Sequence, residues 1–351
     1  MVMNVDAQSE IAPFERCPAL DGYHCVTNSL AKIFYHNGHP LSEDMLLGLG
    51  AGMGFIYWAP KGGYPFVGGR ANPKGFFADL GARTGVRITE VATASDKKAE
   101  SALIERLKRQ EPVMLFGDMG HMPWFHFPVE YHFGGHTFVV CGYDGGEMLL
   151  VSDMDQAADS LKKGFYYAVT LDQIRAVRNS KFKPFPPKNT HIDFDFRGFH
   201  APEPEGIYAS IKQTADAMLN APIKNLGIKG IRHAAKEIGK WPDRFDETGL
   251  MMNLFNLYIF TEIGGTGGGC FRYMYARFLK ESAGITGNRR LEEAAALIDR
   301  SGRAFTRMGL TFKDYTDKSR LAERIAAAGE MLTGAADVEE EAFNILRLSA
   351  K

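Results

Sequence analysis

The spacing of apolar side chains along the first half of the chain changes from a helical period to a strand period. Val26, Leu30, Ile33 and Phe34 follow one face of a helix, so we expect a helix over 25–37 that ends at Asn37-Gly38. Shorter helical patterns follow from Ser42, after Asn72-Pro73, over 95–110 and over 171–178. Apolar runs predict strands over 86–92, 113–116, 136–143, 148–152 and 165–170. Helices followed by an antiparallel sheet indicate an α+β fold.

The second half has a different pattern. Residues 181–204 contain five prolines and no hydrophobic period, which predicts a strap or linker. After residue 205 the period is helical almost throughout, with helices expected over 207–219, 228–241, 249–263, 271–283, 290–308, 319–332 and 338–348. We therefore predict a first domain over 10–180, a proline-rich strap over 181–204 and an all-α domain over 205–351.

The length, charge and cysteine content of the chain exclude several classes of protein. A chain of 351 residues suggests about two domains. Its 41 basic and 42 acidic side chains give a net charge of −1, which provides no general attraction for nucleic acid or anionic membranes. No apolar run approaches the ~18–20 residues of a membrane span. Four cysteines are too few for a disulfide framework, and residues 1–10 lack a signal-peptide pattern, so we expect a cytoplasmic protein.

The chain contains 38 glycines, many of them in two clusters over 48–69 and 264–269. Neither cluster has the spacing of a classical nucleotide-binding loop, because Met53 and Phe55 stand where the dinucleotide fingerprint requires glycine. We expect the first cluster to form a loop at the rim of a cleft beside the 25–37 helix. The second cluster predicts a tight turn between helices that docks against the same cleft.

Three residues form a candidate catalytic set. Cys25 stands at the start of the first predicted helix, where unpaired N–H groups and the helix dipole favour a thiolate nucleophile. His136 opens a strand, and Asp153 ends the next strand after a short Asp144-Gly145-Gly146 turn. A hairpin of that kind places Asp153 opposite His136, so the aspartate orients the imidazole while His136 takes the thiol proton.

Each of these residues also has a purely structural interpretation, as a small buried hydrophobe, a core histidine or a turn aspartate. His121, His126, His132 and His136 lie close in sequence but match no zinc signature, so we expect no metal site. The aromatic loop over 117–133, with Trp124, either walls the cleft or packs on the second domain.

The chain resembles the butirosin-biosynthesis acyltransferase H family over nearly its whole length. The resemblance rests on Tyr23-His24-Cys25, Leu41-Ser42-Glu43, residues 48–55, Gly135-His136, Gly142-Tyr143-Asp144, Val151-Ser152-Asp153, Thr214-Ala215-Asp216, Trp241-Pro242 and residues 264–272. It implies a papain-like cysteine acyltransferase. In the best-known pathway such an enzyme moves an acyl group from a carrier-protein phosphopantetheine thioester to an amine of an aminoglycoside. Carried over, Cys25 is the nucleophile, His136 the base and Asp153 the orienting acid.

The sequence departs from papain-like enzymes in one respect, because no glutamine lies between Arg16 and His24 to complete an oxyanion hole. We consider Asn28, protonated Glu43 or loop backbone as its replacement. Gly52 and Trp124 are expected beside the substrate. Arg272 is expected to pair with a substrate carboxylate or a pantetheine phosphate, unless the glycine turn before it is purely structural.

We therefore predict an acyltransferase of secondary metabolism that passes an acyl group from a thioester to an amine through Cys25. The expected partners are an acyl carrier protein or another acyl-thioester donor and a small-molecule amine, but no nucleic acid and no membrane. No cofactor is expected beyond the phosphopantetheine that a substrate thioester carries. The alternatives are a cysteine peptidase or amidase with the same triad, or an inert small-molecule-binding relative.

Overall fold

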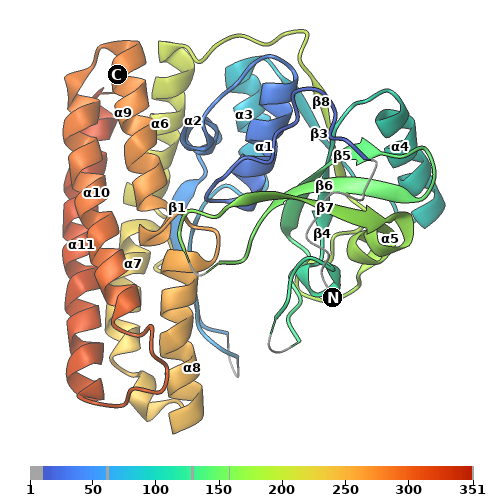
Figure 1. The fold of residues 1–351 in the computed structure, drawn as a ribbon. Helices are drawn as coiled ribbons and strands as arrows, with labels where there is room; N and C mark the ends of the chain where they lie inside the picture. The colour runs from blue at the N-terminus through green and yellow to red at the C-terminus, as the bar shows by residue number, and fades with distance from the viewer. Residues whose placement is uncertain (1–10, 61–62, 128–129, 158, 350–351) are drawn as a thin grey trace. The chain divides into compact units, whose positions relative to one another are not determined.

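The structure, a computed structural model, describes residues 11–60, 63–127, 130–157 and 159–349 (Figure 1). Its contacts divide the chain into two compact units. The first contains the chain up to Glu43 and the segment Gly85–Phe199, and the second contains Asp44–Thr84 and the chain from His200 onward. An antiparallel sheet in the first unit and helices in the C-terminal part confirm the predicted α+β class.

The first unit is built on a six-stranded antiparallel sheet with the strand order β3-β8-β4-β5-β6-β7. The strands are β3 (Arg87–Val91), β4 (Val113–Gly117), β5 (His136–Tyr143), β6 (Met148–Met154), β7 (Gly164–Thr170) and β8 (His191–Asp195). The five predicted strands are confirmed. The sixth, β8, lies inside the segment that we interpreted as a strap, where the prolines conceal its short alternating pattern. It pairs with β3 through Ile88 and Phe194 and with β4 through Met114 and Ile192.

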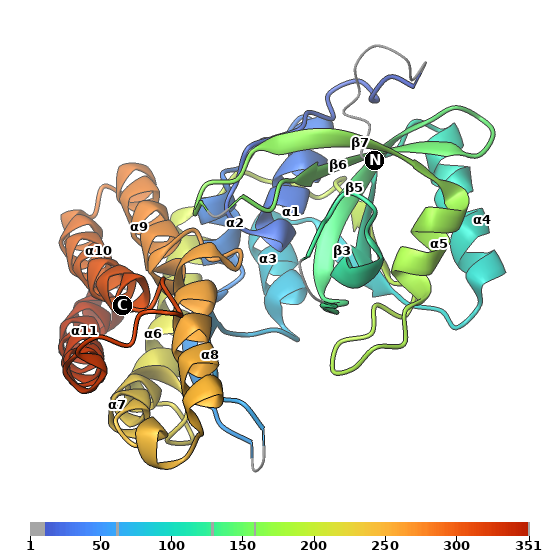
Figure 2. The same cartoon turned by 60° about the horizontal axis from the view of Figure 1, so that its bottom comes forward.

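Helices cover both faces of this sheet. They are α1 (Cys25–His36), α4 (Asp96–Lys108) and α5 (Leu171–Asn179), with a short turn η1 (Met119–His121). Leu103 of α4 and Val177 of α5 join one buried cluster with Phe138 and Val140 of β5. Ser29 of α1 contacts Thr137, which alternates with these β5 residues and therefore faces the other way. As a result, α1 packs on one face of the sheet and α4 and α5 on the other (Figure 2).

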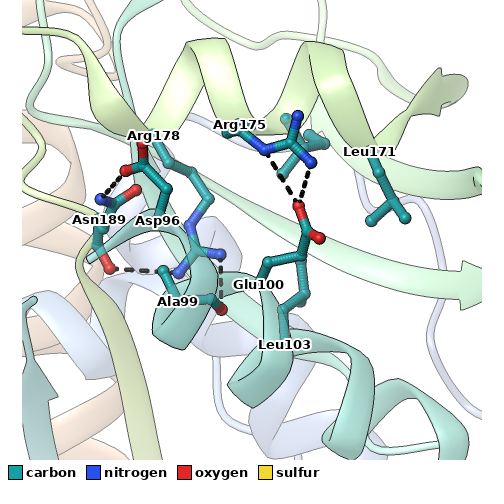
Figure 3. Close-up of a pocket in the computed structure, with 9 residues that line it drawn as sticks. Asp96, Ala99, Glu100, Leu103, Leu171, Arg175, Arg178 and Asn189 are labelled. Atoms are coloured by element: carbon teal, nitrogen blue, oxygen red, sulfur yellow. Dashed lines mark hydrogen bonds and ion pairs between the residues drawn. The ribbon is translucent and has the colours of Figure 1, made fainter.

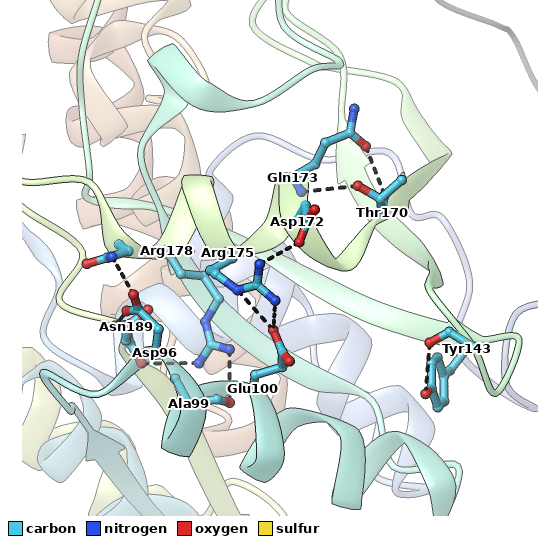
Figure 4. Close-up of polar contacts among 12 residues, drawn as sticks. Asp96, Ala99, Glu100, Tyr143, Thr170, Asp172, Gln173, Arg175, Arg178 and Asn189 are labelled. Atoms are coloured by element: carbon cyan, nitrogen blue, oxygen red, sulfur yellow. Dashed lines mark hydrogen bonds and ion pairs between the residues drawn. The ribbon is translucent and has the colours of Figure 1, made fainter.

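The turn between β5 and β6 determines which ends of these strands meet. Asp144 Oδ1 accepts hydrogen bonds from the N–H groups of Gly146 (2.7 Å) and Met148 (3.1 Å). Gly145 has a φ of +87°, which glycine adopts without strain. The Tyr143 hydroxyl closes the same turn on the Gly146 carbonyl at 3.1 Å (Figure 4). This short hairpin brings the start of β5 opposite the end of β6, as predicted.

Polar contacts join α4 to α5 on the face away from α1. The buried Arg178 guanidinium donates to the carbonyls of Ala99 (3.1 Å) and Asn189 (3.2 Å), and Arg175 pairs with Glu100 (Figures 3 and 4). These side chains line the pocket of Figure 3 and are hydrogen-bonded across it. We therefore interpret this pocket as part of the packing of the unit.

The second unit combines helices with a β-hairpin. Its elements are α2 (Glu43–Leu49, which begins at the unit boundary), β1 (Met53–Trp58), β2 (Phe66–Arg70), α3 (Phe76–Thr84), α6 (Pro204–Leu219), α7 (Gly227–Ile238), η2 (Trp241–Asp243), α8 (Glu247–Tyr258), η3 (Ile259–Ile263), η4 (Gly269–Phe271), α9 (Arg272–Thr286), α10 (Arg289–Leu310) and α11 (Leu321–Ser349). Helix α11 packs against α6, α7 and α10. None of the described helices combines the length and apolarity needed to cross a bilayer.

Three expectations about this unit are wrong. The glycine-rich loop over 48–69 is largely the β1–β2 hairpin, in which Tyr57 pairs with Val67 and Trp58 with Phe66. The helices expected over 319–332 and 338–348 are the single helix α11, which passes through Gly334 because no packing demands a break there. The helix expected over 249–263 changes to a π-turn, η3, over its last residues.

The segment 44–84 also groups differently from the predicted domain boundaries, which placed it with the sheet. The Tyr57 N–H donates to the Asn225 carbonyl at 2.9 Å, and Asn225 Nδ2 returns a bond of 2.7 Å to the Tyr57 carbonyl. Gly48 packs against the Phe278 ring, and Gly69 packs against the Cys270 carbonyl. The two glycine clusters thus belong to one compact unit, where close packing explains several of their members.

One buried ion pair joins the elements of the second unit. Arg272 of α9 and Glu339 of α11 are both 0% exposed, and their side chains meet at 2.8 Å (Nε–Oε1) and 3.1 Å (Nη2–Oε2). Arg272 also donates to the carbonyls of Gly54 (3.0 Å) and Cys270 (2.7 Å), while Glu339 accepts from Ser301. The pair therefore connects α9, α10, α11, β1 and the glycine turn.

We expect Arg272→Met to lower the free energy of unfolding of the second unit by about 3–5 kcal/mol, because it leaves a buried carboxylate without its cation. Arg232→Met is the matched control. Arg232 also pairs with α11, through Asp337 and Glu340, but at the surface, so its loss should cost less than about 1 kcal/mol. Urea unfolding measures both variants, and equal small losses would contradict the structural role of Arg272.

Candidate active site

The side chains of His136 and Asp153 meet at the end of the β5–β6 hairpin. Nε2 of His136 lies 2.9 Å from Oδ2 of Asp153, and the two residues are 5% and 2% exposed. The other carboxylate oxygen, Oδ1, accepts the Met154 N–H at 2.8 Å. Because Nε2 faces the carboxylate, Nδ1 is the ring nitrogen left for a second partner.

Cys25 lies near enough to act on the His136 imidazole. It is the first residue of α1, where the backbone N–H groups of the first turn have no acceptor within the helix. The residue is partly exposed, and the His136 side chain and the Thr137 N–H lie near enough to favour the ionised thiol, which lowers its pKa. The structure therefore brings together the three residues that the sequence analysis singled out, within the first compact unit.

The charges of this set favour a thiolate–imidazolium pair. Burial raises the pKa of Cys25, but the His136 charge and hydrogen bond, with the Thr137 N–H, outweigh it and leave the pKa lowered. Burial disfavours the imidazolium, but Asp153 and the Cys25 thiolate outweigh it and raise the pKa of His136 to about 10. The thiolate is thus present below the pH at which an ordinary thiol ionises, as a cysteine nucleophile requires.

Trp124 contacts the acidic member of the set. Its Nε1–H donates to Asp153 Oδ2 at 3.0 Å, so one carboxylate oxygen receives both the indole and the imidazole. The indole stacks on Tyr167 and meets Phe138 edge-on. We expected Trp124 beside the substrate, and the structure places its polar atom on Asp153, where the ring also shields the carboxylate from water.

Glu43 and Asn28 organise the approach to α1. Glu43 accepts the N–H groups of Tyr23 (2.9 Å) and His24 (3.1 Å) and the hydroxyl of Thr27 (2.7 Å). Asn28 Nδ2 lies 3.3 Å from the carbonyls of both Leu20 and Asp21 and 3.5 Å from Glu43. These contacts occupy the Asn28 N–H groups, so its amide leaves no donor for an oxyanion. Burial raises the pKa of Glu43.

Gly22 is a position that the sequence analysis missed. A Cβ there would lie 2.1 Å from Glu43 Oε1 and 2.2 Å from Asn28 Nδ2, so only glycine lets these two side chains reach the loop before Cys25. The Asp21-Gly22 pair immediately before a helix is a visible turn signal. The reason for the glycine is its contact with Glu43, and no local sequence pattern predicts that contact.

Gly52 and Arg272 have roles in the packing of the second unit. A Cβ on Gly52 would come within 2.8 Å of Leu47 and 2.9 Å of Phe76, which explains the glycine. The expectation that Arg272 binds a substrate carboxylate or phosphate is wrong in this structure. Its guanidinium is fully buried, pairs with Glu339 and donates to the carbonyls of Gly54 and Cys270, so it presents no exposed donor to a ligand.

Of the four histidines considered for a metal site, two cluster with a carboxylate. Ligand atoms of Asp118, His121 and His132 lie within 4.8 Å of one another. Asp118 already accepts four hydrogen bonds, from Gly120 N, Phe133 N, His132 Nδ1 and Ser180 Oγ. This carboxylate therefore ties the loop around it to Ser180 through its hydrogen bonds.

We expect His136→Ala to slow the alkylation of Cys25 by iodoacetamide at pH 6 by about tenfold or more. The variant removes the charge and hydrogen bond that lower the Cys25 pKa, and each unit of pKa changes the thiolate fraction tenfold. His36→Ala, in the last turn of the same helix, should leave the rate unchanged. Mass spectrometry after timed quenching measures the rate, and an equal rate in both variants would rule out the thiolate–imidazolium pair.

Comparison with known protein families places the chain. Residues 24–154 match the family described as "Butirosin biosynthesis protein H, N-terminal", and residues 172–346 match a domain of unknown function (DUF4872). No curated protein matches the chain. The first match contains Cys25, His136 and Asp153. The chain thus contains a domain of the butirosin biosynthesis protein H N-terminal family at residues 24–154, followed by a DUF4872 domain at residues 172–346.

Proposed function

We propose that this protein is a papain-like cysteine acyltransferase that transfers an acyl group from a thioester to an amine. The observation that carries the proposal is the place of Cys25 at the N-terminus of α1, where the buried, hydrogen-bonded His136–Asp153 pair acts on its thiol. A low-pKa thiol beside an oriented imidazole is suited to covalent acyl transfer. The family match over residues 24–154, which contains all three residues, supports an enzyme of secondary metabolism.

The first half-reaction forms an acyl-enzyme. The Cys25 thiolate attacks the thioester carbonyl carbon, and the oxyanion that forms lies near the unpaired N–H groups at the start of α1. The bond to the leaving sulfur breaks, and the His136 imidazolium gives its proton to the leaving thiolate. The products are a new thioester on Cys25 and a free thiol, such as that of phosphopantetheine on a carrier protein.

The second half-reaction releases the acyl group to the acceptor. Neutral His136 now accepts a proton from the attacking amine, while the amine nitrogen bonds to the acyl carbon of the Cys25 thioester. The carbon–sulfur bond breaks, which returns the thiolate and the imidazolium and yields an amide. Asp153 keeps the imidazole oriented and stabilises its positive charge in both halves. We place this chemistry in the cytoplasm, where the four free thiols of the chain remain reduced.

Incubation with acyl-pantetheine thioesters, with and without small amines, tests this proposal. We expect the mass of one acyl group on Cys25 and, with an amine present, the amide product. Cys25→Ala should lose both, with turnover reduced on the order of 10³-fold or more. Cys270→Ala is the matched control, because Cys270 is fully buried in the second unit and should leave turnover unchanged.

The products discriminate the proposal from its alternatives. Free acid alone, in the presence of amines, would indicate a hydrolase that uses the same acyl-enzyme, because water and amines compete for one intermediate. The absence of any acyl group on Cys25, with a reactive thiol, would overturn the assignment of thioesters as donors.

A further inference from the structure

Lys32 lies two helical turns after Cys25 on α1 and is 0% exposed. The seven-residue spacing places both side chains on the face of α1 that packs on the sheet. A lysine with no exposure is unusual, because an ammonium group removed from water needs an acceptor and a compensating charge. The mechanism described above does not use Lys32.

The ammonium group faces the underside of the catalytic hairpin. Its Nζ donates to the carbonyl of Ser152 at 3.2 Å, the residue before Asp153. Among the residues that the structure describes, no carboxylate lies within salt-bridge distance of the Lys32 ammonium group. The charged and titratable groups that act on it are Asp153 of β6, Cys141 of β5, Cys17 of the N-terminal segment and Glu43 at the start of α2.

Counting the buried charges shows what the lysine does. Within the set of Cys25, His136 and Asp153, the thiolate form carries two negative charges, on Cys25 and Asp153, and one positive charge on His136. A lysine ammonium at Lys32 brings the sum over these four residues to zero. Without it, the neutral combination is a protonated Cys25 thiol beside the His136–Asp153 ion pair. Charge balance in a low-dielectric interior therefore links the thiolate to the charge of Lys32.

We propose that Lys32 is a positioning residue of the active site, whose buried ammonium group stabilises the anionic Asp153–Cys25 pair and so maintains the thiolate form of the nucleophile. Lys32 acts through Asp153 and the Ser152 carbonyl and touches no reacting atom. This inference rests on the proposed function, because that function gives the Cys25 thiolate its role. What it describes is the ionisation of Cys25 alone. Burial lowers the pKa of Lys32, and the negative charge of Asp153 is the largest opposing influence.

The pH dependence of Cys25 alkylation in Lys32→Met tests the proposal, since methionine keeps the length of the side chain and removes the charge. Loss of a nearby positive charge disfavours the thiolate, so the midpoint of the alkylation profile should move to higher pH by about one unit. At pH values below the wild-type midpoint this corresponds to an about tenfold slower reaction. A merely structural role would change stability without moving the midpoint.

Lys162→Met is the matched control. Lys162 is 5% exposed in the same unit, its Nζ donates to the carbonyls of Ala157 (2.6 Å) and Asp159 (3.1 Å), and the charges that act on it are those of Asp155 and Asp159. Its midpoint should equal that of the wild type. An unshifted midpoint in folded Lys32→Met, or equal shifts in both variants, would overturn the proposal.

A second measurement does not depend on the folding of a variant. The chemical shifts of the Lys32 side chain in isotope-labelled wild-type protein report its charge directly. An ammonium group across pH 6–8 supports the proposal, and a neutral amine in that range overturns it. Neither readout requires a substrate. A protein that transfers no acyl group can therefore still show the Lys32 effect, and an active acyltransferase can fail to show it.

Discussion

The first unit depends on the hydrogen bond between His136 and Asp153, which joins two buried polar side chains at one end of the sheet. Neither side chain is tolerable there alone, because an unpaired charge in a protein interior costs several kcal/mol. Together they form a pair whose orientation is determined by the hairpin, the Trp124 indole and the Met154 N–H. The aromatic loop, the tight turn and the strand register all serve to keep this contact buried and aligned.

The nucleophile is held from the opposite direction. Helix α1 begins at Cys25 because the preceding loop is tied to Glu43 by two backbone hydrogen bonds, and Gly22 leaves room for the Glu43 carboxyl group. The N–H of Thr137, next to His136, helps to lower the pKa of the thiol. The thiol of α1 is thus influenced by groups of the sheet, so a displacement of either element changes the pKa of Cys25 as well as its position.

The second unit also contains a buried pair of charged side chains. Its helices and the β1–β2 hairpin converge on Arg272, whose planar guanidinium donates to Glu339 and to two backbone carbonyls. A buried pair of this kind is specific in geometry more than it is strongly stabilising, because desolvation offsets much of its Coulomb energy. Gly69 of β2 leaves room for the turn before α9, because a Cβ there would meet the Cys270 carbonyl. Within that turn, Cys270 and Phe271 have positive φ values of +54° and +70°.

The sequence by itself determined the elements that depend on neighbours in the chain. The period of α1, the Asp144 turn and the alternation of β5 and β6 are local, so the meeting of His136 with Asp153 and the place of Cys25 at a helix start were predictable. Only the tertiary structure decided the positions whose partners are far away in sequence. It assigned β8 to the sheet despite the prolines that precede it, paired Arg272 with Glu339, directed Glu43 and Asn28 to the loop before Cys25, and buried Lys32 against the Ser152 carbonyl. For the buried polar side chains among these, the deciding energy is the cost of leaving a polar group unpaired in the interior, and no window of sequence shows which distant residue meets that need.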